Sequence, residues 1–175
     1  MRCFIAIDVP KELREWLAKL QEQLKGVPMT AKFVEKENFH LTLKFFGEIS
    51  DAKVNQIKEN LKEVKFKPFN VSSGKLGVFP SSGYVRVIWI SLEPEEKVKE
   101  LNRLINETLQ SSDARFGSHI TLARVRIIED KEALQKRLRE IKVEEKRFEV
   151  SNFKLKKSTV TRKGPIYEDL KVFEL

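Results

Sequence analysis

The strongest constraint on the fold of this chain is an internal duplication. Residues 39–43, with the sequence Phe-His-Leu-Thr-Leu, return as Ser-His-Ile-Thr-Leu at residues 118–122, 79 positions further on from His40 to His119. Residues 2–10 return at residues 86–94, 84 positions further on, with arginine first and proline last in both copies. The paired segments keep the same order along the chain, so the sequence predicts one structural unit used twice.

Each copy has the pattern of a strand, a helix, a second strand, a second helix and a third strand. Helices are predicted where apolar residues recur every three or four positions, and strands where short apolar runs end at turn residues. Proline at positions 10 and 94 is typical of a helix start. The expected elements are strands at 2–10 and 86–94, each followed by a helix (the first at about 11–25), the two histidine strands, helices at about 51–64 and 131–141, and extended segments at 66–79 and 146–161.

These elements predict an α+β fold in which the duplicated βαβαβ unit forms two lobes related by a pseudo-twofold axis. Antiparallel sheets are expected to flank a central groove, with the helices outside. We expect a single bilobal domain over residues 1–175, with duplicated halves at about 1–80 and 84–161 and a C-terminal segment at 162–175. In that segment Gly164-Pro165 predicts a turn before a last strand.

The only two histidines of the chain occupy matching positions in the two copies. Side chains two residues apart on a strand point to the same face, so His40 projects with Thr42, and His119 with Thr121. The leucine and isoleucine between them point to the other face, toward the core. A pseudo-twofold axis would therefore bring the two polar pairs together across the groove.

Two imidazoles across a groove suit general acid–base catalysis, because histidine titrates near neutral pH and one ring can be neutral while the other is charged. The hydroxyls of Thr42 and Thr121 can donate hydrogen bonds to phosphate oxygens. A single histidine on a strand is more often a structural residue, but two in matched repeats indicate function. A zinc site would need three or four ligands. The sequence offers no third histidine and no cysteine pair, although Asp8 could supply a carboxylate, and no metal or cofactor is expected.

The charge of the chain indicates an anionic partner. A net charge of +8, from 34 basic and 26 acidic residues, favours RNA or a nucleotide over a membrane surface, although a Lys/Glu-rich thermophile surface would look the same. No apolar run approaches the length of a membrane span, and no signal peptide is expected. The single cysteine, Cys3, cannot form an internal disulfide. We therefore expect a cytoplasmic protein, and a monomer.

The sequence resembles the two-histidine phosphoesterase superfamily, and within it the RNA 2′,3′-cyclic phosphodiesterase family, also called 2′–5′ RNA ligases. The resemblance lies in residues 4–10, FIAIDVP, in residues 38–48, NFHLTLKFFGE, and in residues 119–124, HITLAR. It spans nearly the whole chain. It implies a bilobal fold, hydrolysis of a 2′,3′-cyclic phosphate to a 2′-phosphate, and reversible 2′–5′ joining of RNA ends without ATP or metal.

The resemblance also implies residue roles. His119 would be the base that activates water and His40 the acid toward the ribose 3′ oxygen, although the symmetry of the repeats cannot assign these roles. Arg124 would bind phosphate, but strict strand alternation places Ala123, not Arg124, on the face of His119, unless a bulge re-aims the arginine. Alternation does place Lys44 beside His40 and Thr42. Weaker candidates are Phe4, which is expected in the core, and Tyr167, which could line the groove.

The sequence therefore predicts an enzyme that hydrolyses RNA or nucleotide 2′,3′-cyclic phosphates through His40 and His119, with Thr42, Thr121, Arg124 and Lys44 binding substrate. One alternative is an RNA-end binding module without significant turnover. Its RNA affinity would survive the loss of either histidine. Another is a phosphoesterase of the same superfamily that acts on a different cyclic nucleotide or oligonucleotide end.

Overall fold

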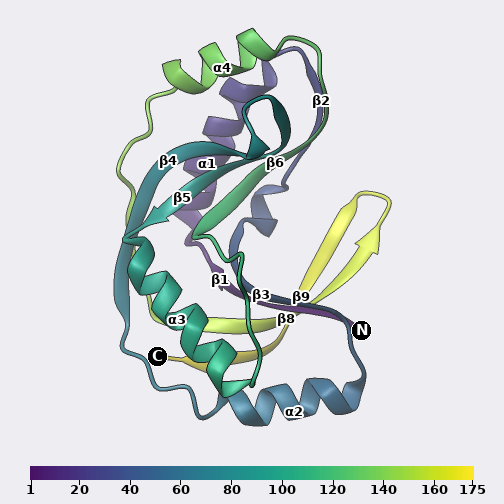
Figure 1. The fold of residues 1–175 in the computed structure, drawn as a ribbon, viewed down its shortest axis with the longest axis vertical. Coiled ribbons are helices and arrows are strands. Elements are labelled where there is room, and N and C mark those ends of the chain that lie inside the picture. Colours follow the sequence, from purple (N-terminus) through teal and green to yellow (C-terminus); the bar gives the residue numbers. More distant parts are fainter.

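The computed structural model describes residues 1–175 and has the α+β architecture predicted from the sequence (Figure 1). The strands are β1 (Arg2–Asp8), β2 (Met29–Phe33), β3 (His40–Glu48), β4 (Phe69–Ser81), β5 (Tyr84–Glu93), β6 (His119–Ile128), β7 (Arg147–Val150), β8 (Asn152–Thr161) and β9 (Gly164–Glu174). The helices are α1 (Lys11–Lys25), α2 (Asp51–Leu61), α3 (Glu95–Thr108) and α4 (Lys131–Glu140), with a short 3-10 turn η1 (Lys36–Asn38). None of the helices has the length and apolarity needed to cross a membrane.

The helix starts follow from local chemistry. Helices α1 and α3 begin directly after Pro10 and Pro94, whose fixed φ suits a helix start. Helices α2 and α4 begin after Ser50 and Asp130, whose side chains accept hydrogen bonds from the backbone N–H three residues on. Helices α1, α2 and α3 bury most of the apolar stripe that predicted them, as Leu13, Leu17, Leu20 and Leu24 do in α1, whereas α4 fully buries only Leu134.

Three local features differ from the sequence-based expectation. Helix α2 ends at Leu61, three residues earlier than predicted, and the chain turns there with Val64 N–H bonded to Leu61 C=O. The segment predicted at 146–161 is two strands, β7 and β8, divided at Ser151. Strand β2 was not predicted: its five residues do alternate apolar and polar, but the segment is short and its apolar side chains are only half-buried.

The strands form one sheet whose order follows the duplication. The order is β7-β4-β5-β6-β3-β1-β8-β9, with β2 paired to β6. In the two copies β1 corresponds to β5, β3 to β6, and β8 to β4. If each strand is replaced by its counterpart, the order β4-β5-β6-β3-β1-β8 reads the same from the opposite end. The third strand of each copy therefore pairs with the first strand of the other copy. Each half of the fold is thus built from both halves of the sequence.

The two histidine strands meet at the centre of this arrangement. Strands β3 and β6 pair only at Leu41 and Ile120, both fully buried, and then diverge. Helices α1 and α4 cover one half of the sheet and α2 and α3 the other, on the side away from the groove (Figure 1). A single apolar core of 35 buried residues runs beneath both halves. This crossing places the first residues of β3 and β6, the two histidines, each one residue from the point where the strands meet.

Candidate active site

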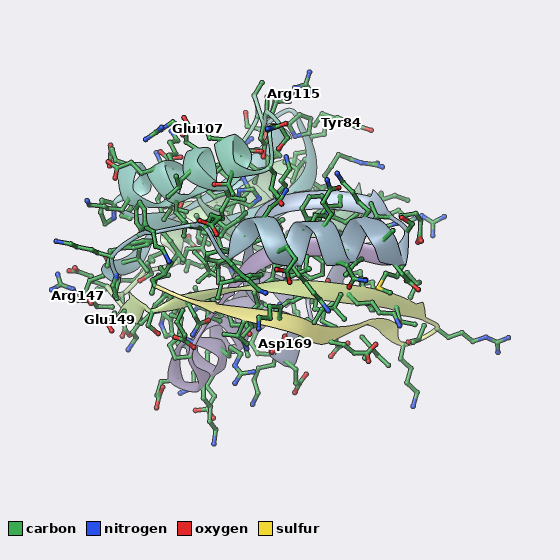
Figure 2. The ribbon with its side chains drawn as sticks, turned by 90° about the horizontal axis from the view of Figure 1, so that it is seen from below. Tyr84, Glu107, Arg115, Arg147, Glu149 and Asp169 are labelled. Atoms are coloured by element: carbon green, nitrogen blue, oxygen red, sulfur yellow. The ribbon has the colours of Figure 1, made fainter.

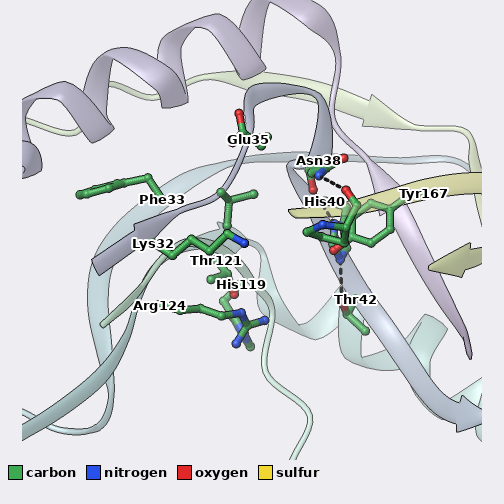
Figure 3. A pocket seen from close by; sticks show the side chains of 12 residues that line it. Lys32, Phe33, Glu35, Asn38, His40, Thr42, His119, Thr121, Arg124 and Tyr167 are labelled. Atoms are coloured by element: carbon green, nitrogen blue, oxygen red, sulfur yellow. Dashed lines mark hydrogen bonds between the residues drawn. The ribbon is translucent and has the colours of Figure 1, made fainter. Parts of the chain in front are cut away.

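Both histidine–threonine pairs line one cavity of about 180 Å³ at the point where β3 and β6 diverge (Figure 3). His40 and Thr42 lie on one side of it, and His119 and Arg124 on the other. The other lining residues come from β2, from the turn after it and from the start of β9: Lys32, Phe33, Val34, Glu35, Asn38, Pro165 and Tyr167, together with Thr121. The polar pairs expected from strand alternation are therefore brought together.

Each imidazole is held by the backbone in the same way. His40 Nδ1 lies 2.7 Å from the carbonyl oxygen of Asn38, and His119 Nδ1 lies 3.0 Å from that of Gly117. A carbonyl oxygen only accepts, so Nδ1 carries the proton in both rings and Nε2 is the nitrogen available for proton transfer. His40 Nε2 lies 2.9 Å from Thr42 Oγ1, whose hydroxyl donates to it when the ring is neutral.

Two matching β-bulges decide which basic residue joins the histidines. On β6, Trp89 pairs with Thr121 and Val87 with Arg124, so Leu122 and Ala123 together occupy the space of one residue. Both of these residues are fully buried, and Arg124 returns to the face of Thr121. Arg124 therefore lines the cavity, against the strict alternation of the sequence-based argument.

The same bulge in β3 moves Lys44 away from the site, and the prediction that Lys44 binds substrate is corrected here. Thr42 pairs with Ala6 and Lys44 with Ile5, so the side chains of Thr42 and Lys44 leave opposite faces of the sheet. Lys44 Nζ instead donates a 2.6 Å hydrogen bond to Asn106 Oδ1 of α3. Alternation failed at Lys44 because it assumes one residue per pairing step.

The pKa of both histidines is lowered from the ordinary value of 6.5. Burial is the main cause in each case, because a poorly solvated imidazolium is costly. The Arg124 guanidinium lowers both values further, while the hydrogen bonds to Asn38 and Gly117 oppose the shift. Near His40 the charges of Lys156 and Asp8 act in opposite directions. The site thus favours neutral imidazoles in the free protein.

Aromatic rings pack against each histidine, but different elements supply them. His40 lies 5.1 Å from Phe4 and 5.3 Å from Tyr167, measured between ring centroids. His119 lies 5.0 Å from Phe79 and 5.9 Å from Trp89. Phe4 is 4% exposed, as expected of a core residue, and Tyr167 lines the cavity.

The strand pairing also corrects the register of the first repeat segments. Asp8 pairs with His40, and Ser91 pairs with His119. The structural equivalents are therefore 83 positions apart from Asp8 to Ser91, not 84. Ala6 of the first copy consequently corresponds to Trp89 of the second. The copies keep the same histidines but differ in the surroundings of each ring.

Sequence reasoning missed the wall of the cavity that β2 and η1 provide. Asn38 connects two parts of the site, because its carbonyl oxygen holds His40 and its side chain donates a 2.9 Å hydrogen bond to the Pro165 carbonyl. The buried side chain of Gln21 holds the end of β2 against β6 through 2.9 Å bonds to the carbonyls of Val34 and Leu122. These are single long-range contacts, and no local pattern announces them.

No three histidine, cysteine, aspartate or glutamate side chains converge in a way that could hold a metal ion. Asp8, the carboxylate considered as a third ligand, is instead paired with Lys154 at 2.9 Å and with Lys156 at 3.0 Å. The functional groups around the cavity include two imidazoles, two threonine hydroxyls, the cationic side chains of Lys32 and Arg124, and a single carboxylate, that of Glu35. A duplicated α+β unit that places two His-x-Thr pairs in one cavity defines a two-histidine phosphoesterase.

Comparison with known proteins gives the family. The sequence pattern described as LigT like Phosphoesterase matches twice, at residues 7–89 and 91–167, and the chain belongs to this family. It is 39% identical over 177 residues to the RNA 2′,3′-cyclic phosphodiesterase of Methanocaldococcus jannaschii, covering 98% of this chain and 99% of that protein. It is likewise 39% identical over 180 residues to the protein of the same name from Archaeoglobus fulgidus, covering 99% and 100%.

Solved structures share the fold. Protein TT0787 of Thermus thermophilus superposes with a TM-score of 0.74 at 26% identity, covering 100% of this chain and 98% of that one. Escherichia coli LigT complexed with 3′-AMP superposes with a TM-score of 0.75 at 24% identity, covering 99% and 97%. The overall fold of this chain is thus shared with solved structures over nearly its whole length.

Proposed function

We propose that this protein hydrolyses 2′,3′-cyclic phosphates at RNA ends, or on nucleotides, to 2′-phosphates. The observation that carries the proposal is the meeting of two backbone-oriented histidines, two threonines and Arg124 in one cavity. Relatives that match nearly the whole chain bear the name RNA 2′,3′-cyclic phosphodiesterase. The net charge of +8 suits a polyanionic substrate.

The two histidines divide the proton transfers between them. His119, neutral, takes a proton from water at Nε2 as the water oxygen bonds to phosphorus. The bond from phosphorus to the ribose 3′ oxygen breaks, and His40, protonated, gives its Nε2 proton to that oxygen. One P–O bond forms and one breaks, and the phosphate stays on the 2′ oxygen. The strain of the five-membered cyclic phosphate favours ring opening without a metal ion.

The remaining groups stabilise the charge that gathers on the phosphoryl oxygens. Arg124 supplies a planar set of N–H donors suited to phosphate, and the Thr42 and Thr121 hydroxyls each supply one donor. Protonation of His40 turns Nε2 into a donor, which frees the Thr42 hydroxyl to turn toward the substrate. If a 5′-hydroxyl replaces water as the nucleophile, the same groups join two RNA ends through a 2′–5′ linkage.

The decisive experiment offers the protein an oligonucleotide that ends in a 2′,3′-cyclic phosphate, in excess EDTA, and separates the 2′-phosphate and 3′-phosphate products. We expect the 2′-phosphate alone, at a rate unchanged by EDTA, because the histidines perform both proton transfers. Binding of the oligonucleotide without turnover would instead favour the RNA-end binding module. A rate that follows added zinc would contradict the two-histidine mechanism.

The pH dependence of kcat/KM should be bell-shaped, with its maximum on the acid side of pH 6.5. Hydrolysis needs one neutral and one protonated imidazole, and burial together with Arg124 lowers the pKa of both rings below 6.5 in the free protein. Activity should fall at high pH as the acid loses its proton and at low pH as the base gains one. The two limbs give apparent pKa values of the pair. An activity that rises steadily through pH 8 would contradict this assignment.

A further inference from the structure

A second groove opens from the histidine cavity and has no part in the proton transfers. It has a volume of about 510 Å³ and shares five residues with the first cavity: His40, Thr42, Arg124, Pro165 and Tyr167. Beyond these residues it runs over the half of the sheet formed by β3, β1, β8 and β9. Its far wall consists of Arg2, Phe45, Ser158 and Val160.

The far wall carries a large aromatic side chain where solvent can reach it. Phe45 pairs with Phe4 across β3 and β1, and the bulge in β3 places both on the groove face. Phe45 is 53% exposed, whereas Phe4 is 4% exposed and packs against His40 and Tyr167. Phe4 is therefore part of the wall, and of this pair it is Phe45 that presents an accessible ring.

Arg2 adds a cation to this ring. Its guanidinium carbon lies 4.9 Å from the centroid of Phe45, in a cation–π contact. Arg2 and Arg124 take part in none of the ion pairs of the molecule, whereas Lys154 and Lys156 of the same sheet face are neutralised by Asp8 and Asp169. The free positive charge in the groove therefore belongs to two arginines, one at each end.

An accessible ring, a stacked guanidinium and a free positive charge are the features that bind single-stranded RNA, because bases stack on aromatic and guanidinium planes and phosphates bind arginine. The terminal ribose is joined to the reacting phosphate through two oxygens, so it must lie beside His40 and Thr42. From there the RNA continues only through its 5′ oxygen. Because the bulge absorbs one residue, Phe45 lies two pairing steps beyond Thr42, roughly 7 Å along the strand.

We propose that the Arg2–Phe45 stack binds the nucleotide that precedes the cyclic-phosphate nucleotide, with its base on the stack and its phosphate near Arg2. The inference rests on the proposed function and makes the preferred substrate an oligonucleotide rather than a mononucleotide. Stacking on a ring is indifferent to base identity, so the preference concerns chain length and not sequence.

The test compares kcat/KM for a dinucleotide that ends in a 2′,3′-cyclic phosphate with kcat/KM for the 2′,3′-cyclic mononucleotide. We expect the natural protein to prefer the dinucleotide by about tenfold, the size of one stacking contact. Phe45→Ala and Arg2→Ala should each bring this ratio close to one, while Phe45→Trp should keep it.

Tyr84→Ala is the matched control. Tyr84 is 60% exposed and lies under Arg86 at 5.5 Å, so it repeats the same pairing at the outer edge of the molecule and lines neither groove (Figure 2). The inference would be overturned if Phe45→Ala, like Tyr84→Ala, left the ratio of the two kcat/KM values unchanged. It would also be overturned if Phe45→Ala lowered kcat/KM equally for the dinucleotide and the mononucleotide. Turnover of the dinucleotide by the natural protein reports the proposed function separately, and the absence of turnover with both substrates would refute that function first.

Discussion

Replacing His119 or His40 by alanine is expected to lower kcat/KM for a cyclic-phosphate substrate by about 10²- to 10⁴-fold, the usual contribution of one general acid or base. Each ring is the only imidazole of its half of the site, and the Nδ1 atom of each ring is already engaged by a backbone carbonyl. Both rings are only partly buried, and their strands are held by apolar neighbours, so melting temperatures should change little. The rates are measured with the oligonucleotide of the EDTA experiment.

A substrate with sulfur in place of the ribose 3′ oxygen separates the two roles. A thiolate leaves without being protonated. Removing the acid should therefore change kcat/KM little, whereas removing the base should lower kcat/KM as much as it does with the oxygen substrate. We expect His40→Ala to recover most of its rate with this substrate and His119→Ala to recover none. The reverse result would exchange the roles, and equal recovery by both variants would contradict acid–base catalysis by the pair.

Arg124→Ala is expected to reduce kcat/KM by about 10²- to 10³-fold, the cost of losing one donor to the charge of a transition state. Lys44→Ala is the matched control, because the sequence suggests that both residues bind substrate and the bulges place only Arg124 at the cavity. The control should stay within about twofold of the natural rate. A large loss in Lys44→Ala with an intact melting temperature would contradict the described bulge.

The same arginine variant should move the pH profile. Arg124 lowers the pKa of both histidines, so removing its charge should raise both apparent values and shift the maximum of kcat/KM toward neutral pH. Arg124→Lys should restore most of the pH profile through its charge but less of the rate, because lysine lacks the planar donor fork. If the pH profile of kcat/KM is unchanged in Arg124→Ala, the charge of Arg124 does not contribute and burial sets the pKa of both histidines.

The regular periodicities of the sequence determined much of this protein. The strand period placed each histidine with its threonine, the helical period located four amphipathic helices, and the duplication indicated the pseudo-twofold relation. These features were predictable because each depends on neighbours within one turn or one strand pair. The resemblance to known proteins added the family and the expectation that Arg124 binds phosphate.

The tertiary structure alone decided how the two copies fit together. The third strand of each copy joins the other copy's half, which no pattern within one strand can reveal. The bulges at Leu43 and Leu122 brought Arg124 to the cavity and turned Lys44 to α3, because pairing with a neighbouring strand sets where the extra residue is absorbed. The same long-range pairing brought Phe4 and Tyr167 to His40, and Trp89 and Phe79 to His119. The local sequence indicates which face of the sheet a side chain points to, but only the pairing with the neighbouring strand determines which residues it contacts there.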